Sequence, residues 1–286
     1  MKKQIRLIAE LGKMKITFAV ALTTIAGYVL AKGGFDSGLI MPTLGIFLLA
    51  CGSSALNHYQ ERDTDALMER TRQRPIPSGQ ISPAGALVIA LVFIIAGSSL
   101  IYFGSNFLAM QLGLLALIWY NGIYTPLKKK TAFAVVPGSV IGAIPPVVGW
   151  VAAGGSVTDP EILILAFFFF IWQVPHFWLL LLKYGKEYEK AGFPSLTSIY
   201  TETQIKNITF IWTLATAIAS LMIATFGIMS SSITRILLLV AAVWLVIGFA
   251  DLIISKNKAF NPFKYFMKIN YFVLVVLVLL TLDVYL

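Results

Sequence analysis

Long apolar runs separated by short polar gaps dominate the chain. Crossing a bilayer as a helix takes roughly 20 mostly apolar residues, and nine stretches meet that requirement. They cover residues 16–32, 39–57, 85–103, 107–124, 133–153, 161–182, 208–228, 233–254 and 269–285. Because the runs are continuous and do not alternate with polar residues, they predict helices and not the strands of a membrane barrel. The pattern therefore predicts an all-α integral membrane protein with nine transmembrane helices.

The basic residues support the same arrangement. If the gaps alternate between the two sides of a membrane, 20 of the 22 lysines and arginines fall on one side, and only Lys32 and Arg235 remain for the other. Cytoplasmic loops carry such an excess. We therefore expect the protein to lie in the cell inner membrane, with its N-terminus on the cytoplasmic side and its C-terminus outside. The net charge of +9 then reflects topology and does not indicate a nucleic-acid partner.

Composition agrees with a single polytopic domain over residues 1–286. Hydrophobic residues make up 58% of the chain, which is too apolar for an ordinary soluble domain of this length. The first run has a basic start and small residues near Ala31, as a signal peptide has, but we expect it to remain as the first span. The only cysteine, Cys51, lies inside an apolar run and is expected to be buried.

The stretch SSALNHYQERDTDALMERTRQRP, residues 53–75, concentrates charge at the end of the second run. If that helix continues, Asn57, Glu61 and Asp65 lie on one face, about 6 Å apart. Oxygen ligands of this kind suit Mg²⁺ that also binds substrate phosphates, and Arg70 and Arg74 are suited to clamp a phosphate. A solvated loop with i,i+4 ion pairs explains this stretch equally well when it is taken alone.

A second polar group follows the sixth run, in WQVPHFWLLLLKYGKEYEKAGFP. His176, Lys183 and Glu187 share one helical face, although Lys183 and Glu187 are also spaced as an ordinary ion pair. Pro175 predicts a kink beside His176. A histidine at that depth is unsuited to lipid. It is a buried core residue, a proton carrier or an axial ligand to a metal porphyrin.

The fourth and fifth runs carry further signals. YNGIYTPLKKKT places Tyr124 and Lys128 at the mouth of the fourth helix, and GAIPPVVGW predicts a break of the fifth helix at Pro145 and Pro146. The long gaps after the second and sixth helices are four helices apart, so a four-helix unit used twice in parallel places both on one face. The acids and cations there suit a substrate with a diphosphate head and an apolar tail.

The polar stretches closely resemble a known family. NHYQERDTDALMERTRQRP is similar to the signature of the protohaem IX farnesyltransferases, or haem O synthases, of the UbiA-type intramembrane prenyltransferases. WQVPHFW, EYEKAGFPSL, YTPLKKKT and GAIPPVVGW are similar as well, and the resemblance spans roughly residues 14–215. Glu61 stands where the family commonly has Asp. Lys186 and Glu187 stand where many members have adjacent Asp residues, so the second motif carries one carboxylate fewer.

The resemblance implies a UbiA-type bundle and a Mg²⁺-dependent transfer of farnesyl from farnesyl diphosphate to a vinyl group of haem b, which yields haem O. It implies metal-binding and catalytic roles for Asn57, Glu61, Asp65 and Glu187. It implies substrate-binding roles for Arg70, Arg74, Tyr124, Lys128, His176 and Lys183. The expected partners are farnesyl diphosphate, haem b, the lipid bilayer and a downstream haem-modifying enzyme or oxidase assembly factor.

Two alternatives remain on sequence grounds. Another UbiA-type prenyltransferase, with a quinone or chlorophyll precursor as acceptor, would use the same chemistry at the acidic motif. A transporter is compatible with nine helices and broken spans. Transporter sites, however, lie near the bilayer midplane, whereas the ionisable residues of this chain gather at one face.

Overall fold

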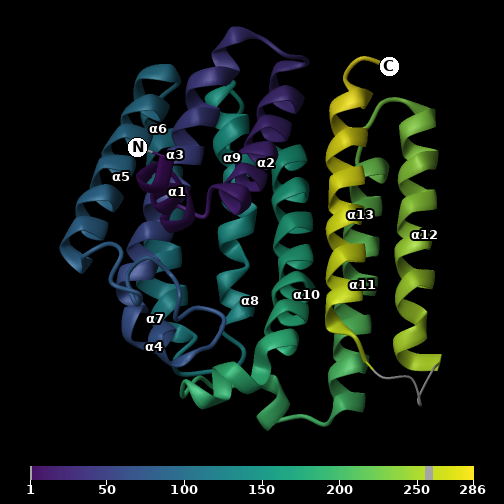
Figure 1. Ribbon diagram of the computed structural model, residues 1–286. Coiled ribbons are helices and arrows are strands. Elements are labelled where there is room, and N and C mark those ends of the chain that lie inside the picture. The colour runs from purple at the N-terminus through teal and green to yellow at the C-terminus, as the bar shows by residue number, and fades with distance from the viewer. Residues whose placement is uncertain (1, 255–259) are drawn as a thin grey trace.

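The computed structural model describes residues 2–254 and 260–286, and within these ranges nine helical segments are long and apolar enough to cross a membrane (Figure 1). The long helices are α2 (Met14–Lys32), α3 (Ile40–Gln60), α5 (Pro83–Gly104), α6 (Phe107–Ile118), α9 (Val140–Ala152), α10 (Pro160–Lys190), α11 (Glu202–Thr225), α12 (Ser232–Ile254) and α13 (Pro262–Asp283). The short elements are α1 (Lys2–Leu11), η1 (Ser37–Leu39), α4 (Arg62–Leu67), the π-helical η2 (Trp119–Tyr124), α7 (Thr125–Leu127), α8 (Val135–Gly138) and η3 (Leu196–Ser198). The prediction of nine membrane helices is confirmed.

Several helices extend beyond their apolar runs into polar sequence. α10 continues eight residues past the expected end at 182, to Lys190, and α13 begins at Pro262 instead of 269. Asn261 caps α13 by accepting hydrogen bonds from the next backbone N–H groups, and Pro262 occupies the first helical position, where a proline is tolerated. Hydropathy marks the lipid-spanning part of a helix, whereas capping residues decide where it begins.

The predicted break at Pro145 and Pro146 is wrong. α9 runs through both prolines, and the interruption of the fifth span falls earlier, at Ser139 between α8 and α9. Tight packing against α2 supports the proline segment, because a Cβ atom added to Gly27 would lie only 1.9 Å from the Pro146 carbonyl oxygen. Neighbouring helices can hold a membrane helix together where proline removes a hydrogen bond. Pro175 likewise lies inside a continuous α10.

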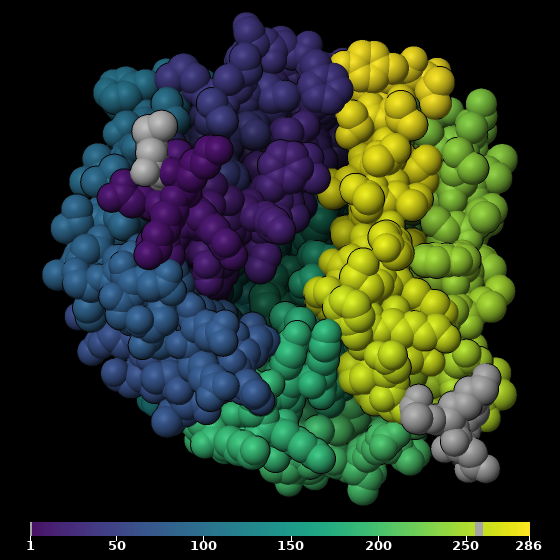
Figure 2. All heavy atoms as spheres, viewed as in Figure 1, coloured from purple at the N-terminus to yellow at the C-terminus, as the bar shows by residue number. Residues whose placement is uncertain are grey.

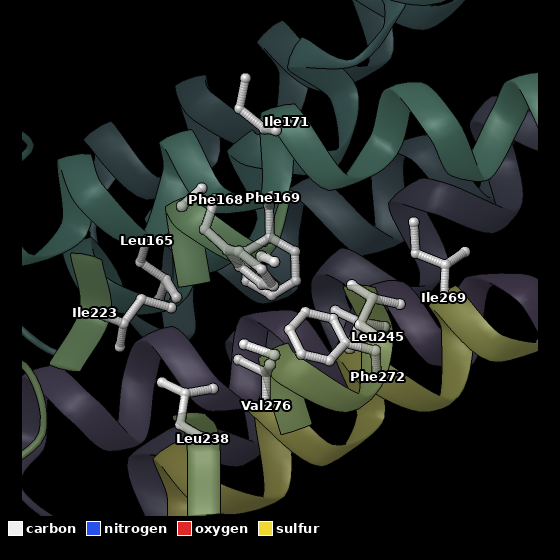
Figure 3. Close-up of a cluster of buried hydrophobic side chains, with 14 of the residues drawn as sticks. Leu165, Phe168, Phe169, Ile171, Ile223, Leu238, Leu245, Ile269, Phe272 and Val276 are labelled. Carbon is white, nitrogen blue, oxygen red and sulfur yellow. The ribbon is translucent and has the colours of Figure 1, made fainter. Parts of the chain in front are cut away.

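Two groups of helices make up the bundle (Figure 1). The first contains α2, α3, α5, α6 and α9, and the glycines of α3 and α5 allow close approach; a Cβ on Gly97 would be 2.6 Å from the Gly45 oxygen. The second contains α10–α13 around the largest buried cluster, which includes Phe168, Phe272 and Leu245 (Figure 3). The expected burial of Cys51 is confirmed, since its exposed fraction is 0%.

The long polar segments after α3 and in α10 converge at one end of the bundle. Figure 1 shows α4 and the end of α10 at this end, with the C-terminus at the other. Met68, just after α4, packs with Tyr188, Ala191 and Phe193 from the end of α10 and the loop beyond it. The expectation that both segments lie on one face is confirmed, and this contact encloses the candidate site.

Candidate active site

The acidic motif does not lie on one unbroken helix, as the sequence analysis assumed. α3 ends at Gln60, Glu61 departs from helical geometry with φ −108° and ψ 6°, and α4 begins at Arg62. The one-turn spacing nevertheless survives. The Glu61 N–H donates to the Asn57 carbonyl at 3.0 Å, and the Asp65 N–H donates to the Glu61 carbonyl at 2.7 Å. The three side chains are buried, with exposed fractions of 1%, 4% and 1% along the chain.

Each of the two buried carboxylates pairs with a cation that is distant from it in the sequence. Arg74 Nη1 lies 2.7 Å from Asp65 Oδ2, and Lys128 Nζ pairs with Glu61 Oε1. Exposed charges of a solvated loop pair weakly and are screened by water. These pairs are largely shielded from solvent, where charge interactions are stronger and a lone charge is costly. The solvated-loop interpretation therefore does not apply to Glu61 and Asp65.

Lys13 is a third cation of the cluster, and the sequence analysis missed it. Its Nζ donates to Asn57 Oδ1 at 3.3 Å, while Asn57 Nδ2 donates to Thr125 Oγ1 at 3.1 Å. Lys13 joins α1 to α2 in a left-handed conformation, with φ 47°. A lysine at the start of an apolar run has the pattern of an interfacial anchor, so no sequence signal separated it from Lys15.

The pKa values of the two lysines move in opposite directions. Burial, with the nearby Arg74 charge, lowers the pKa of Lys13 to about 7. Burial also disfavours the charge on Lys128, but the adjacent Glu61 carboxylate and neighbouring tyrosines outweigh that effect and raise the pKa of Lys128 above its usual range. Lys128 therefore stays positively charged at neutral pH, whereas burial disfavours the charge on Lys13.

Aromatic side chains border the cluster on one side. Lys128 Nζ lies 5.8 Å from the centroid of the Tyr124 ring and 5.7 Å from that of Phe193. Tyr124 in turn contacts Tyr120 at a centroid distance of 5.7 Å and Phe177 of α10 at 6.0 Å. The structure therefore places Tyr124 beside Lys128 and the acidic motif, as the sequence analysis expected.

Glu187 contacts the loop that follows α4. Its Oε2 accepts a 3.0 Å hydrogen bond from the backbone N–H of Arg70. The Arg70 guanidinium lies 4.7 Å from the Tyr184 ring centroid and contacts the Tyr188 hydroxyl at 3.5 Å. Across residues 2–254 and 260–286, no group of three or more His, Cys, Asp and Glu residues is arranged to hold a metal. Beside Asn57, the described part of the chain thus offers the Glu61 and Asp65 carboxylates without a third such ligand arranged with them.

His176 lies in an aromatic setting shared by α10 and α13. Its ring centroid is 4.7 Å from that of Trp172, 4.9 Å from that of Phe266 and 5.4 Å from that of Phe177. Its Nδ1 is buried without a hydrogen-bond partner in the described parts of the chain. Because Phe177 also contacts Tyr124, an aromatic path connects His176 with the charged cluster. The contribution of α13 had no sequence signal beyond hydropathy.

A hollow opens on the face of the molecule shown in Figure 2. It lies between the N-terminal helices α1 and α2 and the C-terminal helix α13, and residues of the α9–α10 region form its floor. The hollow lies on the side of the bundle, between its N-terminal and C-terminal helices. The fold and site together define a multi-pass α-helical membrane protein with a buried acid–cation centre.

Comparison with known proteins identifies the family. The model of the UbiA prenyltransferase family matches residues 20–272. The chain belongs to this family. A protein of Oleidesulfovibrio alaskensis named protoheme IX farnesyltransferase is 34% identical over 98% of this chain and 96% of its own length. One of the same name from Geobacter sulfurreducens is 39% identical over 77% of this chain and 81% of its own length.

Solved structures share the fold. A structure described as digeranylgeranylglyceryl phosphate synthase in membranes matches with a TM-score of 0.77 at 17% identity, and covers 99% of each chain. A UbiA homolog from Archaeoglobus fulgidus, bound to GPP and Mg²⁺, matches with a TM-score of 0.67 at 14% identity over 96% of this chain and 99% of its own. The expected UbiA-type bundle is confirmed.

Proposed function

We propose that this protein transfers the farnesyl group of farnesyl diphosphate to a vinyl group of protohaem IX, and releases diphosphate and haem O. The observation that carries the proposal is the buried cluster of Asn57, Glu61 and Asp65 with three cations at one end of an apolar bundle. This cluster occurs in a chain whose relatives over most of its length are named for that reaction. It is suited to an anionic head, and the bundle to an apolar tail.

The residues present fit a magnesium ion. Two carboxylates and one amide oxygen match the ligands that Mg²⁺ takes when it also binds substrate phosphates. Asn57, Glu61 and Asp65 would hold the ion, which when bound supplies positive charge against the phosphate oxygens. Glu187 as a further metal ligand remains a prediction. Because Glu61 and Asp65 are paired with Lys128 and Arg74, substrate binding would transfer these cations from carboxylate to diphosphate.

The chain's cations would act on the leaving group. As the bond between farnesyl C1 and the bridging oxygen breaks, negative charge develops on diphosphate. Lys13, Arg74 and Lys128 are already clustered where such charge would be stabilised without rearrangement of solvent. Arg70, at the outer edge beside Tyr184, is a further cation for the diphosphate.

The aromatic border would protect the allylic cation. Tyr120, Tyr124 and Phe177 offer ring faces to positive charge and keep water away until the haem vinyl attacks. A new carbon–carbon bond then joins farnesyl C1 to the outer vinyl carbon. The resulting cation on the inner vinyl carbon takes up water and loses a proton, which leaves the hydroxyl of haem O. We assign His176 and Lys183 to binding of the haem.

We also propose in which membrane the protein lies and which side its site faces. With 20 of 22 basic residues on the side that carries the site, the site mouth would face the cytoplasm and the protein would lie in the cell inner membrane. The bilayer would hold the farnesyl tail and the product. A downstream haem-modifying enzyme or oxidase assembly factor would receive haem O.

Purified protein supplied with farnesyl diphosphate, protohaem and Mg²⁺ is expected to release diphosphate and form haem O, as measured by a phosphate-coupled assay and pigment mass spectrometry. Chelation of the metal is expected to stop both, and added Mg²⁺ to restore both, because the two buried carboxylates serve the metal. Diphosphate release that occurs only when a quinone precursor replaces protohaem would indicate a different acceptor. No release with any acceptor would contradict the proposed function.

Lys13→Met is expected to weaken binding of an unreactive farnesyl diphosphate analogue by about 10-fold, because a charge-assisted hydrogen bond to the diphosphate is lost. Isothermal titration calorimetry measures the change. Lys15→Met is the matched control, since Lys15 is exposed two residues further along. Equal affinity in the wild-type protein and Lys13→Met would remove Lys13 from the site.

A further inference from the structure

The face that α10 shares with α13 forms a continuous aromatic seam. Trp172, His176 and Lys183 lie on one side of α10, because spacings of four and seven residues return to the same helical face. Phe263, Phe266 and Asn270 share one side of α13 for the same reason. The seam is closed at its deeper end by a 3.2 Å hydrogen bond from the Trp172 indole N–H to the carbonyl of Ile269.

Lys183 marks the outer end of this seam. Its Nζ lies 3.8 Å from the centroid of the Phe263 ring and 5.2 Å from that of Tyr184. Among the ion pairs of residues 2–254 and 260–286 it has no carboxylate partner. Glu187, which the sequence spacing offered as its partner, binds the Arg70 backbone instead. An exposed ammonium that lies against aromatic rings is available to an anionic group of a ligand.

His176 occupies the middle of the seam, two helical turns or about 10.5 Å deeper than Lys183. Its imidazole packs against Trp172 and Phe266, and Asn270 lies beside it. Within residues 2–254 and 260–286, Asn270 is a hydrogen-bonding neighbour of the imidazole, but no partner reaches the buried Nδ1, a cost that an apolar side chain would avoid. A neutral imidazole between aromatic rings is a suitable axial ligand for iron in a flat macrocycle.

We propose that the haem acceptor lies along the α10–α13 seam, with its iron at His176 and a propionate at Lys183. The proposal rests on the proposed function, and deepens it by setting the acceptor's orientation. The offset between the two residues is similar to the distance from iron to a propionate carboxylate in haem. The Lys183 charge, the aromatic lining and the His176 nitrogen thus match three separate features of haem, namely a propionate, the flat macrocycle and the iron.

This orientation directs the reactive edge of the haem. Propionates and vinyl groups lie on largely opposite edges of protohaem, so a propionate at Lys183 leaves the vinyl edge free to face the interior of the bundle, where Phe177 lies beside His176. From His176, the contact with Phe177 at 5.4 Å and from Phe177 to Tyr124 at 6.0 Å leads toward Lys128 and the acidic motif. A vinyl group over Phe177 would meet farnesyl C1 where diphosphate departs. Lys183 then determines which edge reacts.

The contact between Lys183 and a propionate can be tested by absorbance titration in detergent. The two ligands are protohaem and its dimethyl ester, which lacks the negative charge of the propionates. Lys183→Gln is expected to weaken protohaem binding by about 10-fold and to leave the binding of protohaem dimethyl ester unchanged. Lys129→Gln, an exposed lysine at the same end of the bundle, is expected to affect neither ligand. Equal affinities of Lys183→Gln and wild type for protohaem, or equal losses for both ligands, would overturn the propionate contact.

A second ligand pair tests the iron contact. His176→Ala is expected to weaken protohaem binding and shift its Soret band, to leave metal-free protoporphyrin IX binding unchanged, and to regain the wild-type spectrum with added imidazole. Retained binding of a farnesyl diphosphate analogue shows that the variant is folded. Equal loss of haem and metal-free porphyrin would overturn the ligation. If the wild-type protein forms haem O but both variants bind their ligands as the wild type does, only the proposed position of the haem is refuted. If the wild-type protein forms no haem O, the proposed function itself is refuted.

Discussion

Replacing Asp65 with asparagine is expected to lower haem O formation by about 10³-fold, because a metal-supporting carboxylate contributes several kcal/mol to stabilising charge on the leaving group. Asp65 is 1% exposed and pairs with Arg74 at 2.7 Å. Under the proposed function its loss would remove a ligand for Mg²⁺, and it would also take away the partner of Arg74. Pigment extraction and mass analysis from cells that lack their own haem O would measure the effect.

The same stretch provides a matched control. Asp63→Asn changes a carboxylate two residues earlier whose side chain is 84% exposed and makes only a loose 3.7 Å pair with Arg62, so activity should stay near wild type. A guanidinium that is largely shielded from solvent, as Arg74 is, destabilises a protein when it loses its partner. The double variant Asp65→Asn/Arg74→Gln should therefore regain thermal stability without regaining activity. Normal haem O in Asp65→Asn would remove the assigned role.

Lys128→Met is expected to lower the rate of diphosphate release by about 10²-fold, since loss of one preorganised donor to a developing anion typically has an effect of this size. Lys128 is paired with Glu61 and borders Tyr124. The adjacent Glu61 carboxylate raises the pKa of Lys128, so the Lys128 ammonium is fully charged at neutral pH. Single-turnover kinetics would separate this step from substrate binding.

Its neighbours in the sequence supply the control. Lys129→Met removes an exposed lysine of the same cluster and should leave the rate unchanged. Lys128→Arg keeps the charge while changing its shape, so we expect a partial rate between those of Lys128→Met and wild type. If Lys128→Met and Lys129→Met release diphosphate equally fast, Lys128 is an anchor at the membrane surface and not part of the reaction.

The pairing of acids with cations explains how charges are tolerated at the end of an apolar bundle. Unpaired, each buried carboxylate or ammonium would be costly. Paired as Glu61 with Lys128 and Asp65 with Arg74, they form a site with little net charge. A metal ion with a diphosphate can then replace these partners together, whereas either alone would leave one set of charges unmatched.

The sequence by itself determined the number of spans, the strong bias of basic residues to one side, and the grouping of Asn57, Glu61 and Asp65. These properties depend on local physics. A run of roughly 20 apolar residues is excluded from water wherever it occurs, and four-residue spacing keeps side chains one turn apart even across the bend at Glu61. No other part of the chain is needed to establish them.

Only the tertiary structure decided which charges face each other. Lys13 has the sequence context of a surface anchor, yet a left-handed residue at the α1–α2 junction directs it to Asn57. Glu187 binds the loop after α4 instead of Lys183, and α13, with no polar motif of its own, supplies Phe266 against His176. Such contacts depend on how distant helices pack, and hydropathy is the same for every arrangement that buries the same residues.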